Sequence, residues 1–255
     1  MRYRAGNPIV AGVVAAALIM AIPGAPATIA GGPEAAVENW PYVVRVLTEP
    51  GAAHCAGVLV TRYSVVTAAR CVEGREPGAL TILAGRRGPD GNAGITVLVA
   101  GTWTQPEQPP DKGKTHDIAV LTLTRPVPVP SGRLPKLAGP GFRYAPGTKA
   151  TILGWGRLPY TGEWPDTLRK ADVVVGSGAS CARPGEDSFA DSMVCASRPD
   201  GGEDTCRDGS GGPVLVGDTV IGIVAAGPGC ARPDRPGRYT EVASILAELP
   251  LTGSS

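Results

Sequence analysis

The stretch DTCRDGSGGPVLVG at residues 204–217 places a serine, Ser210, among glycines and directly before an apolar run. Glycine-rich turns adopt backbone conformations that other residues resist, and such a turn can hold a serine hydroxyl exposed. The pattern therefore indicates a nucleophile loop. A serine hydroxyl is a weak nucleophile without a neighbouring base. The chain has only two histidines, His54 and His116, that could supply one.

Short β-like runs broken by Gly, Pro and Asp fill most of the chain around this loop. They recur about every ten to twenty residues, with few helical patterns between them, which is typical of an all-β barrel or sandwich. The one helix candidate is the segment 241–250, whose apolar residues have helical spacing. The proline-rich stretch 125–141 is predicted to be an extended connector between two halves. The β-like runs are 42–48, 56–61, 79–85, 95–103, 118–124, 149–156, 171–177, 212–216 and 219–227.

The first 27 residues have the pattern of a signal peptide. Arg2 and Arg4 precede an apolar run at 9–22, and Ala-Pro-Ala at 25–27 has the form of a signal-peptidase site. The apolar run has about 14 residues, short of the roughly 20 that a membrane span needs. We therefore expect a secreted, soluble mature protein, and the alternative is an uncleaved membrane anchor.

Charge and cysteine content narrow the function classes. Without the first 27 residues, 22 basic residues face 23 acidic ones, and no basic run suggests nucleic-acid binding. Six cysteines in an exported chain indicate three disulfides rather than metal ligands, although spacing alone leaves 15 possible pairings. Neither histidine forms a zinc pattern with them. We expect no metal, no cofactor and a monomer.

Seven motifs in order identify what the chain resembles: the trypsin/chymotrypsin-like serine endopeptidases. The resemblance implies two six-stranded antiparallel β-barrels, about 28–124 and 142–240, with an active site between them and a short C-terminal helix at about 241–250. It also implies the disulfides Cys55–Cys71, Cys181–Cys195 and Cys206–Cys230. The motifs are TIAGGPEAAVENWPYVVRV at 28–46, HCAGVLVTRYSVVTAARCVEG at 54–74, HDIAVLTL at 116–123, ILGWG at 152–156, DSMVCAS at 191–197, DTCRDGSGGPVL at 204–215 and GIVAAGPGC at 222–230.

The family's catalytic base is missing from its expected position. The resemblance assigns Asp117 and Ser210 to the catalytic triad, but the residue directly before Cys71, where the family has histidine, is Arg70. The histidine takes the serine's proton and returns it to the leaving amine. A guanidinium stays protonated and has no lone pair for that task. We therefore expect Arg70 to form an ion pair with Asp117 instead, and the alternative is that Arg70 points to solvent.

Neither histidine is expected to replace the missing base. The resemblance places His54 on the rim of the cleft, too far from Ser210 for a direct hydrogen bond. His116 precedes Asp117, and neighbouring side chains of a strand point to opposite faces. We interpret both as ordinary surface or half-buried histidines.

The oxyanion loop also departs from the family pattern. The family has Gly-Asp before the serine, whereas this chain has Asp208 and Gly209. The family's glycine N–H helps form the oxyanion hole, and its aspartate binds the N-terminal amine that activation frees. Here Gly209 has no carboxylate for that amine. Thr28 precedes Ile29 where a trypsin-like activator would require Arg or Lys.

The specificity pocket is better preserved. Asp204 matches the carboxylate at the base of the trypsin pocket, and Gly227 and Gly237 match its wall glycines, which implies a pocket for Arg or Lys. The alternative is that Asp204 only pairs with a nearby basic residue such as Arg207. Ala-Ala at 225–226 replaces the family's Ser-Trp, which predicts weaker peptide binding.

Three functions fit these features. The preferred one is a secreted pseudo-protease that binds a protein partner or a basic peptide in its cleft. The second is an active serine endopeptidase that cleaves after Arg or Lys with an unusual base. The third is a structural module without a specific ligand.

Overall fold

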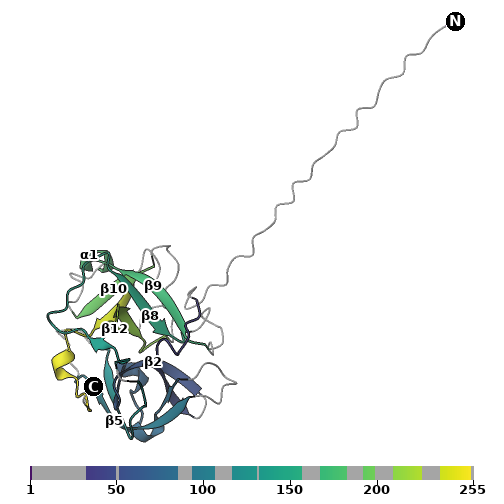
Figure 1. Cartoon of the computed structure of the whole chain (residues 1–255). Coiled ribbons are helices and arrows are strands. Elements are labelled where there is room, and N and C mark those ends of the chain that lie inside the picture. Colours follow the sequence, from purple (N-terminus) through teal and green to yellow (C-terminus); the bar gives the residue numbers. More distant parts are fainter. Residues whose placement is uncertain are drawn as a thin grey trace.

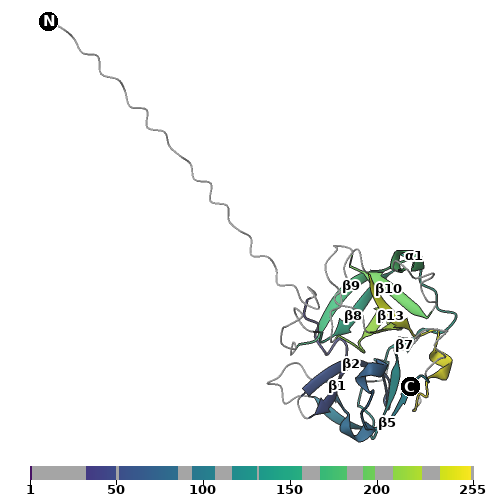
Figure 2. The ribbon, with the colours of Figure 1, turned by 180° about the vertical axis from the view of Figure 1, so that it is seen from behind.

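The computed structural model shows two β-structures stacked on one another, seen from opposite sides in Figures 1 and 2. The segment predicted to be a signal peptide, 1–27, lies outside the described residues except for Met1. The described residues are 1, 33–49, 52–85, 94–106, 117–130, 132–156, 167–182, 192–198, 209–225 and 236–253.

The first six strands form a closed antiparallel barrel in the order β1-β2-β3-β6-β5-β4. Alternate side chains of each strand face the interior of this barrel, as the two-residue period of a strand requires. In β5, Val97 and Val99 are buried, whereas Leu98 between them is exposed. The strands are β1 (Val43–Glu49), β2 (Ala52–Thr61), β3 (Ser64–Thr67), β4 (Thr81–Ala84), β5 (Ile95–Thr104) and β6 (Ala119–Leu123).

The later strands form a second antiparallel barrel in the order β11-β8-β9-β10-β13-β12, which the pairing of β11 with β12 closes. The predicted class, all-β with two six-stranded barrels, is therefore confirmed. The strands are β8 (Lys149–Gly154), β9 (Arg169–Val175), β10 (Met193–Ser197), β11 (Pro213–Val216), β12 (Thr219–Val224) and β13 (Gly237–Glu241).

Helices are few and short in the part of the chain that the structure describes. They are α1 (Gly178–Cys181) and the 3-10 helices η1 (Ala69–Cys71), η2 (Pro77–Ala79) and η4 (Leu246–Glu248). No helix among these residues is long and apolar enough to cross a membrane.

The C-terminal helix is shorter than the expected 241–250. Glu241 still belongs to β13, and the helix is the single 3-10 turn η4, Leu246–Glu248. Leu249 is extended, with φ −69° and ψ 119°, because the residue before a proline disfavours the helical region and Pro250 follows. Val242, Ile245 and Leu249 are nevertheless buried as the pattern predicted, and Leu246 is partly buried.

The connector at 125–141 also holds a strand that its prolines did not predict. The two residues of β7 (Lys136–Leu137) pair in parallel with Thr219 and Val220 of β12. The connector therefore adds an edge strand to the second barrel.

The apolar core of the first barrel extends to residues of the second barrel, whose interior also holds a separate buried cluster. Leu153 and Trp155 near β8, and Leu215 of β11, belong to the same buried cluster as the interior of the first barrel. A continuous apolar junction fixes the barrels against each other, since separating them would expose that surface to water.

Two of the three expected disulfides lie within the described residues. Cys55 bonds to Cys71 and Cys181 bonds to Cys195, each with a Cα separation of 6.1 Å. The third expected pair, Cys206 and Cys230, lies outside the described residues.

Candidate functional site

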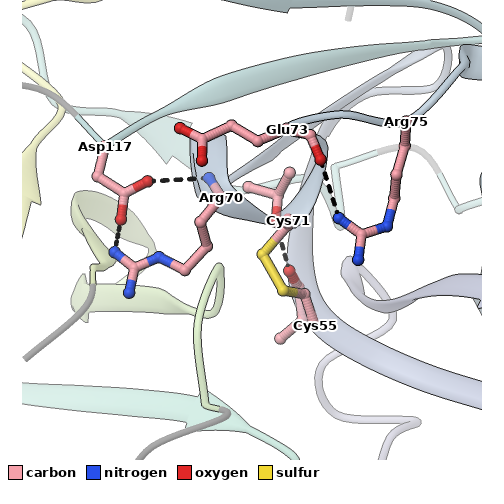
Figure 3. The surroundings of a disulfide bond; sticks show 8 residues. Cys55, Arg70, Cys71, Glu73, Arg75 and Asp117 are labelled. Carbon is pink, nitrogen blue, oxygen red and sulfur yellow. Dashed lines mark hydrogen bonds and ion pairs between the residues drawn. A yellow bond between two sulfur atoms is a disulfide. The ribbon is translucent and has the colours of Figure 1, made fainter.

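Arg70 and Asp117 form an ion pair in the first barrel, as the sequence predicted. Arg70 Nη2 contacts Asp117 Oδ2, and the Arg70 backbone N–H donates to Asp117 Oδ1 at 3.2 Å (Figure 3). The alternative in which Arg70 points to solvent does not occur, because only 29% of its side chain and 24% of that of Asp117 are exposed.

Local structure explains why these two residues meet. Arg70 is the middle residue of η1, and the next residue, Cys71, is tied to Cys55 of β2 by the disulfide drawn in Figure 3. Asp117 lies two residues before β6, which pairs with β3 directly ahead of η1. The ends of two paired strands thus bring the two charges together.

Ser210 lies in the turn before β11, against the first barrel. The Ser210 carbonyl accepts a hydrogen bond from Ala56 N at 2.9 Å, and Ser210 is 9% exposed. The next residue, Gly211, has a φ of +87°, which favours glycine. A Cβ there would collide with Ala56 O and Thr67 Oγ1. The glycine in this turn is therefore required both by backbone conformation and by close approach to β2 and β3.

A short chain of contacts joins Ser210 to the ion pair. Ala56, whose N–H donates to the Ser210 carbonyl, follows Cys55 in the chain. Cys55 forms a disulfide with Cys71, the residue after Arg70. Thr67 Oγ1 fixes this segment by donating to Ala56 O at 2.7 Å. These contacts connect the Ser210 turn to the segment of the first barrel that carries Arg70.

The second barrel also holds Asp117 in place. Thr240 Oγ1 of β13 donates to Asp117 O at 3.3 Å. Sequence reasoning did not single out Thr240, Thr67 or Ala56 as site residues. The hydroxyl of Thr67, at the end of the apolar strand SVVT, was the one available signal, because buried hydroxyls need partners.

The Arg70 guanidinium remains a cation in this setting. Burial lowers the pKa of Arg70 to about 10, and the charge of Glu73 opposes that shift. At pH 7 only about one molecule in a thousand would carry the neutral form even at that pKa. Arg70 can therefore donate hydrogen bonds and hold an anion, but it cannot accept the proton of Ser210.

One nitrogen of Arg70 is unsatisfied. Its Nε is buried and has no hydrogen-bond partner. Together with the ion pair through Nη2 alone, this leaves part of the guanidinium fork unused.

Of the other predicted site residues, the structure describes Gly209 and Gly237. Gly237 begins β13, and a Cβ there would collide with the hydroxyl of Tyr239. Gly209 lies beside Gly154 of β8. The carbonyl oxygen of Gly209 would be 3.7 Å from a Cβ added to Gly154. The remaining predicted residues Asp204, Asp208, Gly227, His116, Thr28 and Ile29, and the side chain of His54, lie outside the described part of the chain.

Comparison with known proteins agrees with this architecture. The family model described as Trypsin matches residues 29–248. A protein named Trypsin from Saccharopolyspora erythraea is 40% identical over 221 residues, which cover 87% of this chain and 96% of that protein. Trypsin-1 from Astacus astacus is 34% identical over 227 residues, covering 84% and 95%. Trypsin eta from Drosophila erecta is 31% identical over 226 residues, covering 84% and 86%.

Proposed function

Because this chain belongs to the trypsin family of serine peptidases, we propose that it is a secreted pseudo-protease. In this proposal the fold is kept, hydrolysis is lost, and the cleft binds a protein partner or a basic peptide. The signal-peptide pattern at 1–27 supports secretion.

The single observation that carries the proposal is the ion pair between Arg70 and Asp117. In an active triad the aspartate orients a histidine, and that histidine moves the proton. Here the carboxylate is engaged by a permanent cation. Losing a triad histidine costs on the order of 10⁶ in rate, which removes useful turnover.

The order of Asp208 and Gly209 supports the same proposal from the oxyanion side. It puts a carboxylate where the family has the glycine of the oxyanion hole, so a negative charge stands near the place where the transition state would develop one. Losing one oxyanion donor costs about 10² to 10³ in rate. The two losses overlap and do not multiply, because groups that act as a unit are not additive.

The proposed ligand class follows from the pocket residues. Asp204, Gly227 and Gly237 stand in the sequence where the trypsin pocket has its basal carboxylate and its wall glycines. The hydroxyl of Tyr239 occupies the space that a Cβ at Gly237 would need, so this position requires glycine. A ligand with an exposed Arg or Lys is therefore the best match. Ala225 and Ala226 stand where the family has Ser-Trp, so the aromatic wall of the pocket is missing. We therefore expect weaker peptide binding than in an active relative.

An amidase assay tests the loss of hydrolysis. The purified secreted protein is incubated with an arginyl peptide nitroanilide, beside an active trypsin diluted to set the detection limit. We expect no turnover above a catalyst-free blank, no change in Ser210→Ala, and no labelling of Ser210 by an organophosphonate. Turnover that disappears in Ser210→Ala would establish the alternative, an active endopeptidase with an unusual base.

A binding assay tests the ligand class separately. Benzamidine or an arginyl peptide should bind the wild type and should lose most of its affinity in Asp204→Asn. Binding to neither protein would favour a structural module without a specific ligand, and equal binding to both would show that Asp204 does not recognise the basic group.

A further inference from the structure

The outer face of the first barrel carries two exposed apolar side chains in one row. Apart from Met1, Tyr63 and Leu98 are the only exposed large hydrophobic side chains in the part of the chain that the structure describes, at 38% and 55% exposure. Hydrogen bonds across the strands align them: Leu123 N donates to Tyr63 O at 2.8 Å, and Thr124 N donates to Leu98 O at 3.0 Å. Neighbouring strands lie about 4.8 Å apart, so the two residues are about 10 Å from each other.

Rigid elements hold these two side chains toward solvent. Ser64 and Val99, which follow them in the chain, are buried, so the alternation of a strand turns Tyr63 and Leu98 outward. Gly253 also packs against the tyrosine ring, because a Cβ added to Gly253 would be 3.0 Å from Tyr63 Cδ2. A partner that covers these groups therefore has little protein motion to suppress, which lowers the entropic cost of binding.

One arginine accompanies each end of the row. Arg62 directly precedes Tyr63, and its Nε donates to Val127 O at 3.3 Å. Arg125 donates from Nη2 to Thr96 O at 2.7 Å, two residues before the exposed leucine of β5. Each apolar group thus has a cation beside it.

Neither guanidinium has an acidic partner among the described residues. Arg62 and Arg125 are exposed, and each binds one backbone carbonyl through one nitrogen. Lys136 and Lys170, by contrast, are each paired with an aspartate. The other nitrogens of the two arginines remain for an external acceptor, and a guanidinium can hold a carboxylate through two parallel hydrogen bonds.

Charge and apolar area together select the kind of partner. A polyanion such as an anionic membrane is held by clusters of about four to eight basic residues, and only two are present here. A sulfated polysaccharide also offers no apolar group to cover Tyr63 and Leu98. A polypeptide segment that carries both acidic and apolar side chains satisfies the guanidinium groups and removes the apolar surface from water.

We propose that this surface docks an acidic segment of a partner protein that also carries apolar side chains. It lies apart from the cleft, because Ala56, which binds Ser210, is five residues before Thr61 at the end of β2, about 16 Å along the strand. The proposal therefore does not depend on the cleft binding a basic peptide. The arginine–apolar surface consists of Arg62, Tyr63, Leu98 and Arg125.

Matched peptides test the arginine–apolar surface. A fluorescein-labelled peptide of three Glu-Glu-Leu repeats is titrated with the purified protein, and its anisotropy is compared with that of Gln-Gln-Leu and Glu-Glu-Ser repeats. The Glu-Glu-Leu peptide should bind about tenfold tighter than the uncharged peptide and about fivefold tighter than the peptide without leucine. The first difference should shrink as salt is raised. Equal binding of all three peptides, or binding of none, would overturn the proposal.

Variants assign the binding to the surface residues. Arg62→Gln combined with Arg125→Gln should abolish the preference for Glu-Glu-Leu over Gln-Gln-Leu. Leu98→Thr should reduce the preference for Glu-Glu-Leu over Glu-Glu-Ser, and it should fold, because Leu98 is exposed and threonine suits a strand. Preferences that survive in these variants would show that the peptide binds elsewhere.

A second double variant controls for net charge. Arg75→Gln combined with Arg143→Gln removes the same charge from other places, and both arginines donate only to backbone carbonyls. This variant should bind all three peptides as the wild type does. An equal loss of the glutamate preference in both double variants would mean that overall charge, and not this surface, attracts the peptide.

A measurement on the wild type covers the case in which the arginine variant does not fold. In protein labelled with ¹³C at the leucine methyl groups, the Leu98 signals are assigned by their loss in Leu98→Thr. They should shift with the Glu-Glu-Leu peptide and not with benzamidine, the probe of the cleft. Benzamidine should also leave the peptide bound. Displacement of the peptide by benzamidine would place the peptide in the cleft and refute the arginine–apolar surface without refuting the proposed function.

Two polyanions complete the test. A heparin oligosaccharide and vesicles of phosphatidylserine with phosphatidylcholine are titrated against the wild type and the variant Arg62→Gln with Arg125→Gln. We expect both to bind more weakly than the Glu-Glu-Leu peptide. Tighter binding of either one that is lost in the variant would assign the surface to a polysaccharide or a membrane and overturn the proposal.

Discussion

Asp117 is held by Arg70 at two points, with the guanidinium on Oδ2 and the backbone N–H on Oδ1. The backbone bond does not depend on the side chain at position 70, so it would persist in any variant there. The ion pair does depend on it. Mutations at position 70 therefore separate what the guanidinium contributes from what the turn contributes.

Removing only one member of this pair should destabilise the fold more than removing both. Arg70→Ala leaves the carboxylate of Asp117, three-quarters buried, without its counter-ion, which should cost about 1–3 kcal/mol of unfolding free energy. The double variant with Asp117→Ala should cost less than the two single changes added together. Urea unfolding of all four proteins measures this coupling. Strictly additive costs would mean that the ion pair contributes nothing.

The turn at Ser210 should tolerate no side chain at Gly211. Gly211→Ala combines a φ of +87° with collisions against Ala56 O and Thr67 Oγ1, so it should cost more than about 3 kcal/mol or prevent folding. Gly217→Ala is the matched control, because Gly217 also has a positive φ, +61°, but no atom lies within 4 Å of an added Cβ. It should cost only about 1 kcal/mol. Similar thermal melts of the two variants would contradict the close approach.

The end of the chain is fastened to the first barrel through Ser64. Ser64 is fully buried, its Oγ donates to Thr252 O at 3.1 Å, and it accepts from Thr252 N at 2.9 Å. Figure 1 shows the C-terminus beside this barrel. Ser64→Ala should cost about 1 kcal/mol, because the Thr252 N–H loses its acceptor, whereas Thr252 O keeps its hydrogen bond from Thr61 Oγ1.

Ser244→Ala provides the control for this fastening. Ser244 is exposed and its Oγ donates to Glu241 O at 2.9 Å, so its loss should cost less than about 0.5 kcal/mol. In Ser64→Ala, limited digestion with carboxypeptidase should also remove residues from the end of the chain faster than in the wild type. Equal digestion rates would show that these hydrogen bonds do not hold the terminus.

Stability should fall in alkali because of two tyrosines. Burial raises the pKa of Tyr42 to about 12, and burial together with the hydrogen bond to Glu241 raises the pKa of Tyr144 well above its usual value of 10. Because the pKa is higher in the folded state, each tyrosine contributes fully to the unfolding free energy below pH 10. This contribution declines as the pH rises above 10, since the tyrosine ionises first in the unfolded chain. For Tyr42, about 1 kcal/mol should be lost by pH 11.

Phenylalanine variants isolate this effect. Unfolding free energy measured from pH 8 to pH 11 should decline less steeply in Tyr42→Phe than in the wild type. Tyr63→Phe is the control, because Tyr63 is 38% exposed, and its decline should match that of the wild type. Identical slopes in all three proteins would contradict the raised pKa.

Local pattern predicted most of the fold because strand periodicity is a local property. The nine runs recognised in the sequence all contain observed strands, from β1 to β12. Four strands lie outside these runs. β3, SVVT, and β10, MVCAS, are short, β7 has two residues and exists only through its pairing with β12, and β13, GRYTE, is largely polar. Strands of this kind are fixed by distant partners, which a local pattern does not contain.

The contacts of the candidate site also divide into those that the sequence predicted and those that it did not. The resemblance placed Arg70 where the family's histidine meets the aspartate, and complementary charge then predicted the ion pair with Asp117, since a buried carboxylate needs a counter-ion. The hydrogen bond from Thr240 to the backbone of Asp117 joins residues 123 positions apart. Nothing near either residue specifies it, because it depends on how the two barrels dock.

Restoring histidine at position 70 should not by itself restore hydrolysis. Arg70→His would supply a base beside Asp117, and the backbone bond to Oδ1 would still orient the carboxylate. We expect the oxyanion side to remain defective, because Asp208 stands in the sequence where the family has the oxyanion-hole glycine, and Gly209 offers no carboxylate to a new N-terminus. We expect no amidase activity above blank from this change alone.

The smallest set expected to recover activity adds Asp208→Gly and Gly209→Asp, with Ile29 made the free N-terminus. Arginyl amidase assays of the single and combined variants, each with its Ser210→Ala control, measure this directly. Strong serine-dependent activity from Arg70→His alone would show that the oxyanion loop is functional as it stands, and that the missing base is the whole defect.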